Sequence, residues 1–148
     1  MQDKIVGRNS VLELLRRGNR EIERILIAEG SQHSRLRQIR TIAQKKGIRC
    51  DFTPRRELDE VEIDVPHQGI IAIVSPTSYI DLQTLLDLPQ PSAHPPLLIA
   101  LDQIQDPRNL GAIIRTADAV NANGLIFPKD NAAGITTAAH KASAGSAE

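Results

Sequence analysis

The chain has very few aromatic residues. Its 148 residues include two Phe, one Tyr and no Trp. Any hydrophobic core must therefore be built from Leu, Ile, Val and Ala. Proteins that bind single-stranded nucleic acid by stacking its bases need exposed aromatic side chains for the purpose. The composition thus argues against a stacking platform, and it predicts that any RNA contact relies on phosphates and on shape.

Cysteine and long apolar runs are also scarce. Cys50 is the only cysteine, so an intrachain disulfide is impossible and a reducing compartment is expected. The first residues contain no apolar run of signal-peptide length, and no later stretch is long enough to span a membrane. We therefore expect a soluble cytoplasmic protein that has no membrane partner.

Several common catalytic motifs do not occur in the sequence. It has neither a Gly-x-x-x-x-Gly-Lys phosphate loop nor a Gly-x-Gly-x-x-Gly fingerprint. The pair Gly145-Ser146 lacks the glycine that a nucleophile elbow needs two residues after its serine. The four histidines are far apart and lack metal-ligand spacing, so no metal site is predicted. Cys50 has no neighbouring histidine, which favours a core residue over a nucleophile.

Charge is divided unevenly along the chain, although the net charge is zero. Residues 1–56 hold 14 of the 18 Lys and Arg and 6 of the acids, whereas residues 57–148 hold 4 basic and 12 acidic residues. Such asymmetry points to a nucleic-acid partner for the basic half, although solvated arginines scattered on helix faces would give the same count. Eleven of those 14 are arginines, which suit bidentate phosphate contacts. We take Arg8, Arg16 and Arg17 as candidate RNA-binding residues.

Helical and extended patterns alternate through residue 74. A capping box from Ser10 to Glu13 is expected to open the first helix, and Gly18 to end it. The last segment, 69–74, is apolar almost throughout, which suits a strand buried on both faces. These patterns predict a small three-layer α/β domain over residues 1–75. Between the first helix and the last strand, the expected elements are a strand at 22–28, a helix at 34–46, a strand at 48–52 and a short helix at 54–61.

A proline-rich stretch separates this domain from a second one. Residues 89–96 contain four prolines, which predicts a stiff linker, and we assign 76–96 to the linker together with a short helical stretch at 80–88. A second α/β unit is expected over 97–148. Its predicted elements are a strand at 97–101, a loop at 102–108, a helix at 109–120, a strand at 124–127 and a helix near 135–144.

The start of the helix in this second unit is a candidate ligand site. A strand followed by a loop and a helix N-terminus is the usual ligand-binding geometry of open α/β sheets. Asn109 is a favoured N-cap residue. Arg108 and Arg115 are seven residues apart, so they fall on nearly the same helix face, with Gly111 and Ala112 between them. The pattern predicts two guanidinium groups flanking a smooth backbone patch, although an ordinary capped helix with an exposed arginine would show the same residues.

Four segments resemble one enzyme family. The segment 107–117, which reads PRNLGAIIRTA, resembles the first signature motif of the SpoU/TrmH-type RNA 2′-O-ribose methyltransferases. Residues 6–15 resemble the opening of that family's substrate-binding domain, and residues 67–72 resemble the segment that closes it. Residues 141–148 are similar to the family's Lys-x-Ser-x-Gly-Ala-x-Glu stretch. The resemblance covers essentially the whole chain.

The resemblance implies a fold, a reaction and a set of site residues. It implies that 1–75 is an L30e-like α/β/α substrate-binding domain and that 97–148 is the first half of a SPOUT-type trefoil-knot domain. The family transfers a methyl group from S-adenosylmethionine to a ribose 2′-oxygen of RNA, here of ribosomal RNA, and its members are usually homodimers. By motif, Arg115 and Asn109 are the catalytic residues, while Arg108 joins the RNA-binding set. Because a guanidinium stays charged at neutral pH, we expect Arg115 to bind the phosphate beside the target ribose and to stabilise the developing alkoxide.

Two family segments are not found in this sequence. They are a Gly-x-Glu-x-x-Gly-type loop and a Ser-Leu-Asn-Val-Ser-type segment, which form the knot and enclose the cofactor. We therefore expect the cofactor pocket and the dimer interface to be incomplete in this chain. Three interpretations stay open: a truncated methyltransferase, a non-catalytic RNA-binding remnant that uses 1–75, and an unrelated α/β domain that binds another anion at the helix of Asn109.

Overall fold

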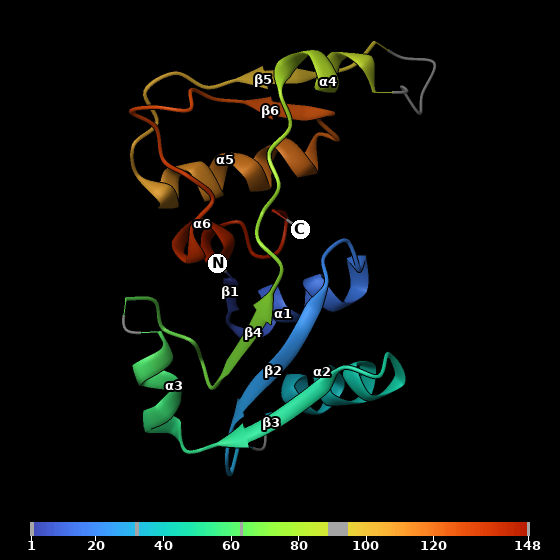
Figure 1. Ribbon diagram of the computed structural model, residues 1–148, viewed down its shortest axis with the longest axis vertical. Helices are drawn as coiled ribbons and strands as arrows, with labels where there is room; N and C mark the ends of the chain where they lie inside the picture. Colours follow the sequence, from blue (N-terminus) through green and yellow to red (C-terminus); the bar gives the residue numbers. More distant parts are fainter. Residues whose placement is uncertain (1, 32, 63, 89–94, 148) are drawn as a thin grey trace.

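The computed structural model describes residues 2–31, 33–62, 64–88 and 95–147. Two α/β units follow one another along the long axis of the molecule (Figure 1). In this described part of the chain, no helix combines the length and the apolarity that a membrane span requires. The elements, in chain order, are β1 (Asp3–Val6), α1 (Arg8–Arg17), β2 (Ile22–Ala28), α2 (Ser34–Lys45), β3 (Arg49–Thr53), α3 (Arg55–Val61), β4 (Ile70–Val74), α4 (Leu82–Asp87), β5 (Leu98–Ala100), α5 (Pro107–Ala119), β6 (Gly124–Ile126) and α6 (Thr137–Ala142).

The first unit is a four-stranded mixed sheet with helices on both faces. The strand order is β1-β4-β2-β3, in which β2 and β3 run parallel and the other pairs run antiparallel. The central strand β4 is buried at all five positions, as its apolar sequence predicted. Its alternate residues enter two different cores. Ile70 lies in the core formed with α1 and α2, while Ile71 lies in the core that also contains Leu58 of α3.

The beginning of the first unit differs from the sequence prediction. The capping box predicted from Ser10 to Glu13 is wrong, because α1 begins at Arg8 and Ser10 is buried inside the helix. Gly7 is the N-cap residue, with a φ of 91° that favours glycine. The short strand β1, which precedes it, was not predicted. The end of α1 at Gly18 is confirmed, since this glycine is left-handed and its N–H donates to the carbonyl of Leu14 at 3.0 Å.

The second unit is built on two short parallel strands, β5 and β6, which α5 connects. Leu110 and Ile114 of α5 form a small core with Ala133, which lies between β6 and α6. Helix α4 lies against β6, because a Cβ placed on Gly124 would approach the Leu85 Cδ1 atom to 2.8 Å. Of the predicted linker at 76–96, residues 89–94, which form most of its proline-rich stretch, lie outside the described residues.

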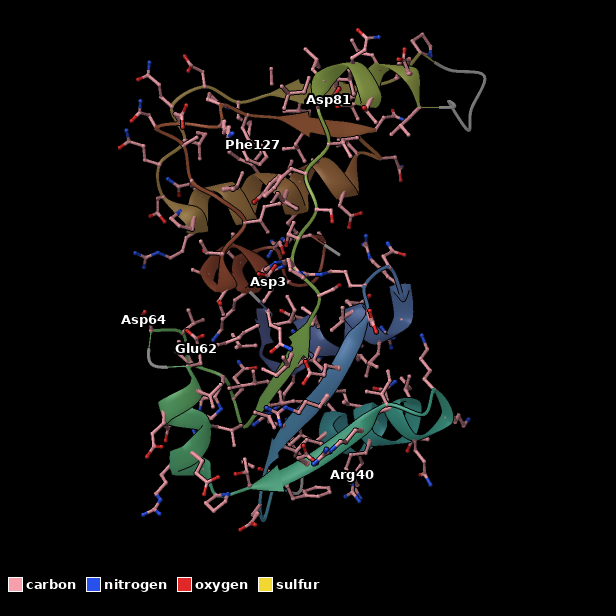
Figure 2. All side chains as sticks on the ribbon, viewed as in Figure 1. Asp3, Arg40, Glu62, Asp64, Asp81 and Phe127 are labelled. Carbon is pink, nitrogen blue, oxygen red and sulfur yellow. The ribbon has the colours of Figure 1, made fainter. Side chains whose placement is uncertain are left out.

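The two units contact each other through α6. This helix lies between α5 and the first sheet (Figure 1), and it packs on both α5 and β1. Figure 2 shows Asp3 at this junction, where its carboxylate accepts hydrogen bonds from Arg20 at 2.8 Å and from the backbone of Thr77 at 2.7 Å. Arg20 also lies 3.3 Å from the ring of His140 on α6, which is only 1% exposed. A partly buried polar network therefore joins α6 to the first unit.

Candidate functional site

Helix α5 begins earlier than the sequence pattern suggested. Asp106 is its N-cap residue, and the Asp106 carboxylate accepts from the backbone N–H of Arg108 at 2.8 Å. The prediction that Asn109 caps the helix is therefore wrong, since Asn109 lies inside the first turn. The local reason is Pro107, whose fixed φ suits the first helical position and which has no N–H to satisfy there. An Asp-Pro pair followed by an apolar stripe was the signal for this start.

The three polar residues that the sequence singled out on α5 are all exposed. The Arg108 side chain is 81% exposed, and its Nε atom lies 3.5 Å from the Asp106 carboxylate. Asn109 and Arg115 are also exposed, and neither side chain makes a hydrogen bond or an ion pair to another residue that the structure describes. Arg108 and Arg115 share one helix face, about 10 Å apart along the axis at ~1.5 Å per residue. This face can therefore receive an anionic ligand.

The backbone patch predicted beside these arginines is not open. Gly111 is buried against α6, where an added Cβ would overlap the carbonyl oxygen of Ala139 and lie 2.6 Å from the Cβ of Ala142. The glycine thus permits two helices to pack closely, and it leaves no path for a ribose. Ala112, about 100° around the helix from Gly111, is the small exposed residue between the two arginines. The prediction of a smooth patch at Gly111 is wrong for this reason.

Arg8 has a place inside the first unit. Its Nε atom donates to the carbonyl of Gln68 at 3.1 Å, and its backbone N–H donates to the Gln68 side chain at 3.2 Å. These bonds hold the loop before β4 against the start of α1. The residue is only partly exposed. Arg8 is therefore engaged in holding the fold together, at the position where the sequence suggested an RNA contact.

Arg16 and Arg17 lie near the second unit. Arg16 pairs with Glu13 at 2.7 Å on the same helix, while Arg17 reaches across to Asp118 of α5 at 2.7 Å. The hydrogen bond from Arg17 holds the pKa of Asp118 below its ordinary value. Asp118 is three residues beyond Arg115, so the two are neighbours on α5. The structure thus brings Arg17 close to the helix turn that carries Arg115.

The same two arginines line an open groove of about 510 Å³. It lies between α1, α2 and the segment that follows α6, and Arg35 of α2 also contributes to its wall. A second cavity of about 270 Å³ lies between β1 and the start of α6. Neither cavity lies at the carboxyl ends of β5 and β6, where open α/β sheets usually bind their ligands.

Sequence reasoning missed an exposed pair on the first unit. Phe52 of β3 is 51% exposed, and the guanidinium carbon of Arg40 lies 4.9 Å from the centre of its ring. The expectation that aromatics would not serve for stacking followed from their number alone. One signal was present in the sequence, since residues 30–50 contain six Lys and Arg and no Asp or Glu.

A cysteine nucleophile and a metal site are the two other kinds of chemistry considered from the sequence. Cys50 packs against the first core, and burial raises the pKa of its thiol, as suits the core role that the sequence favoured. Among the residues that the structure describes, no three His, Cys, Asp or Glu side chains gather into a group that could hold a metal ion.

Two family models match the chain. Residues 4–80 match the model described as RNA 2′-O ribose methyltransferase substrate binding, and these residues are more than half of the chain. Residues 96–148 match the model described as the SpoU rRNA methylase family.

This chain belongs to the SpoU RNA methyltransferase family. The resemblance drawn from the sequence motifs is thereby confirmed.

Curated relatives of this SpoU-family chain are longer than it is. The chain is 37% identical over 146 residues to YacO of Bacillus subtilis, which is named as a TrmH family tRNA/rRNA methyltransferase. It is 38% identical over 146 residues to RlmB of Pseudomonas syringae, a 23S rRNA (guanosine-2′-O-)-methyltransferase. Each match covers 99% of this chain and 58% of the relative. The SpoU-family chain therefore spans little more than half the length of these relatives.

Solved structures share the fold of the SpoU-family chain. The SpoU methyltransferase AviRb from Streptomyces viridochromogenes superimposes with a TM-score of 0.70 at 23% identity, over 98% of this chain and 50% of that one. The AdoMet-bound rRNA methyltransferase from Sinorhizobium meliloti gives a TM-score of 0.71 at 20% identity, over 99% and 51%. The predicted α/β class is confirmed as a fold of mixed sheets and helices similar to that of the SpoU methyltransferases.

Proposed function

We propose that this chain is part of an S-adenosylmethionine-dependent RNA 2′-O-ribose methyltransferase that acts on ribosomal RNA. One observation carries the proposal: Arg115 and Asn109 lie exposed on α5, inside the segment that matches the SpoU methylase model. The RlmB relative from Pseudomonas syringae, named for the same reaction on 23S rRNA, supports the choice of substrate. S-adenosylmethionine supplies the methyl group when it is bound, and the roles given below are those of this chain's own residues.

In this proposal Arg115 binds the phosphate next to the target ribose. Its guanidinium stabilises the negative charge that develops on the 2′-oxygen, and it does not take the proton, because arginine stays charged at neutral pH. Arg108, on the same exposed helix face, binds a second phosphate of the RNA. Asn109 helps to shape the site at the first turn of α5. Asn109 and Arg115 make no side-chain hydrogen bond or ion pair to other described residues. Both side chains are therefore available for these roles.

We further infer how the rest of the chain serves this reaction. Residues 1–75 form an L30e-like RNA-binding domain, 76–96 form a linker, and 97–148 begin a SPOUT-type knotted domain. The match of residues 4–80 to the substrate-binding model supports the first assignment. The complete protein works in the cytoplasm as a homodimer, as the resemblance implies.

The alternative is an RNA-binding protein without catalysis. One observation favours it, since 14 of the 18 Lys and Arg lie in residues 1–56. In that case residues 1–75 carry the activity, and Arg115 serves only as a phosphate contact.

Single-turnover methyl transfer tests the role of Arg115. The complete gene product that carries this chain is incubated with tritiated S-adenosylmethionine and ribosomal RNA. We expect Arg115→Ala to slow transfer by ~10²–10³, because loss of a donor that stabilises developing charge has this effect. Its affinity for S-adenosylmethionine, measured by calorimetry, stays within a factor of about two of the wild type, since Arg115 has no part in binding the cofactor. A large loss of cofactor affinity argues against the phosphate role, and an inactive wild-type protein argues against the proposed function.

A further inference from the structure

Helix α2 carries positive charge that no acid within its stretch of sequence compensates. The stretch from residue 30 to 50, which contains this helix, holds six Lys and Arg and no acid. Arg37 and Arg40 are exposed on α2, and neither forms an ion pair with another described residue. By contrast, the arginines of α1 are hydrogen-bonded within the protein. An anionic partner is therefore attracted to α2 without displacing an internal ion pair.

Helix geometry places these two arginines at the edge of the sheet. They are three residues apart, so they are neighbours on the helix surface. Strand β3 is an edge strand, and Figure 2 shows Arg40 next to it. The first acid after α2 in the sequence, Asp51, pairs with Arg49 at 2.7 Å. Because side chains alternate along a strand, this pair lies on the face of β3 away from α2. The positive charge of α2 therefore stays uncompensated at this edge.

Phe52 adds an aromatic surface to the same edge. It lies two residues beyond Cys50, which packs into the core covered by α2, so both residues point to the α2 side of β3. The ring is half exposed, and the Arg40 guanidinium carbon lies 4.9 Å from its centre. Such a cation–π pair is only weakly stabilising at an exposed site. The pair thus presents stacked planar groups at the surface, which is what an unpaired base needs for stacking.

We propose that Arg37, Arg40 and Phe52 form an RNA-docking site, the α2–β3 site, which holds an unpaired nucleotide. The base stacks against the Arg40–Phe52 pair, and Arg37 binds the adjacent phosphate. The inference rests on the proposed function, since it names a surface by which the same protein holds its RNA. Figure 1 shows α2 and β3 at the lower end of the molecule, whereas α5 lies in the upper unit. The α2–β3 site therefore contacts RNA away from the methylated ribose and favours RNAs that have a loop at that distance.

Fluorescence anisotropy of the 148-residue chain with two RNA probes tests this site. One probe is a fluorescein-labelled hairpin with an unpaired loop, and the other is a blunt duplex with the same number of phosphates. We expect Phe52→Leu to weaken hairpin binding about 5- to 150-fold, which corresponds to ~1–3 kcal/mol for one stacked base. Duplex binding stays unchanged, because a duplex offers no free base. Phe52→Tyr keeps the ring and retains the hairpin affinity of the wild type.

Salt titrations of the same complexes separate the phosphate contact from stacking. Arg37→Gln lowers the slope of log K against log salt concentration by about 0.7–0.9, the value for one phosphate contact. Phe52→Leu leaves this slope unchanged. Arg56→Gln is the matched control, because Arg56 is an exposed arginine on α3, the helix that covers the other face of the sheet. We expect this control to change neither the hairpin affinity nor the slope.

Three results overturn the α2–β3 site while leaving the proposed function intact. They are wild-type hairpin affinity in Phe52→Leu, a loss of affinity in Phe52→Tyr equal to that in Phe52→Leu, and an effect of Arg56→Gln equal to that of Arg37→Gln. A wild-type chain that binds neither probe at low salt contradicts the RNA-binding part of the proposed function as well. Circular dichroism confirms that each variant is folded before its affinity is compared.

Discussion

The close contact between α5 and α6 makes Gly111 sensitive to any added side chain. A Cβ at this residue overlaps the carbonyl oxygen of Ala139 and lies 2.6 Å from the Cβ of Ala142. An ordinary contact between carbon atoms is ~3.5–4.0 Å, so α6 must move by about 1 Å to accept the methyl group. The obstructing atoms belong to backbone and to an alanine, so no change of rotamer can relieve the overlap.

The substitution Gly111→Ala therefore has two opposing effects. Alanine favours the helical state over glycine by about 1 kcal/mol. Overpacking of a well-packed contact costs typically ~1–3 kcal/mol, and a displaced α6 also disturbs its contact with β1 and the hydrogen bonds around His140. Because the clash involves backbone, we place its cost at the upper end of that range. The expected net loss is about 1–2 kcal/mol of unfolding free energy.

Urea unfolding followed by circular dichroism measures this loss. We expect Gly111→Ala to have a lower midpoint than the wild type with an unchanged slope. Gly134→Ala is the control, because Gly134 is exposed, its φ is not in the left-handed region, and an added Cβ there meets only the Tyr79 hydroxyl at an ordinary 3.8 Å. We expect Gly134→Ala to have the same urea midpoint as the wild type. A Gly111→Ala protein as stable as the wild type contradicts the close packing of α5 on α6.

Three other predictions concern ionisable groups. Burial acts to raise the pKa of Asp3, but hydrogen bonds from Thr77 and Arg20 hold this pKa below its ordinary value. The ionised Asp3 carboxylate therefore stabilises the fold above pH ~4, and this stabilisation is lost as the pH falls through the lowered pKa. Asp3→Asn should therefore flatten the acid side of a plot of urea midpoint against pH, and an unchanged acid side contradicts this. Arg17→Ala removes the ion pair between Arg17 and Asp118, in which both side chains are about one-third exposed. The substitution should therefore lower the free energy of unfolding by only ~0–1 kcal/mol, and this difference should vanish in high salt. A loss of several kcal/mol that persists in salt contradicts that estimate. Because burial raises the pKa of Cys50, the thiol should react with a thiol reagent at pH 8 more slowly in the native protein than free cysteine does. In the unfolded protein, the rate of this reaction should approach that of free cysteine.

The sequence correctly predicted those elements whose own residues determine where they lie in the fold. Strand β4 was predicted because it is apolar at every position, and its two faces do enter two cores. The end of α1 at Gly18 was predicted because the left-handed conformation favours glycine. The start of α5 was mispredicted, because the pattern around Asn109 was given more weight than the Asp-Pro pair before it.

The misplaced parts of the site depend on partners that are distant in sequence. Gly111 was expected at a surface, but its neighbour is α6, and no pattern around residue 111 indicates that contact. Arg17 is bonded to Asp118, which is 101 residues away. The exposure of Phe52 follows from the place of β3 at the sheet edge, which the strand order decides. Composition predicted that the first unit is positively charged. It did not predict that the charge without ion-pair partners lies on α2.

We propose that α5 carries the site of an RNA 2′-O-methyltransferase. Alkaline digestion of labelled RNA tests it most directly, because a 2′-O-methyl group removes the hydroxyl that alkaline cleavage requires. The complete gene product is incubated with tritiated S-adenosylmethionine and ribosomal RNA, and the RNA is then digested. We predict that the tritium is recovered in alkali-stable dinucleotides, and that Arg115→Ala reduces this product at least about 100-fold. Tritium in mononucleotides, or a fully active Arg115→Ala protein, would contradict the claim.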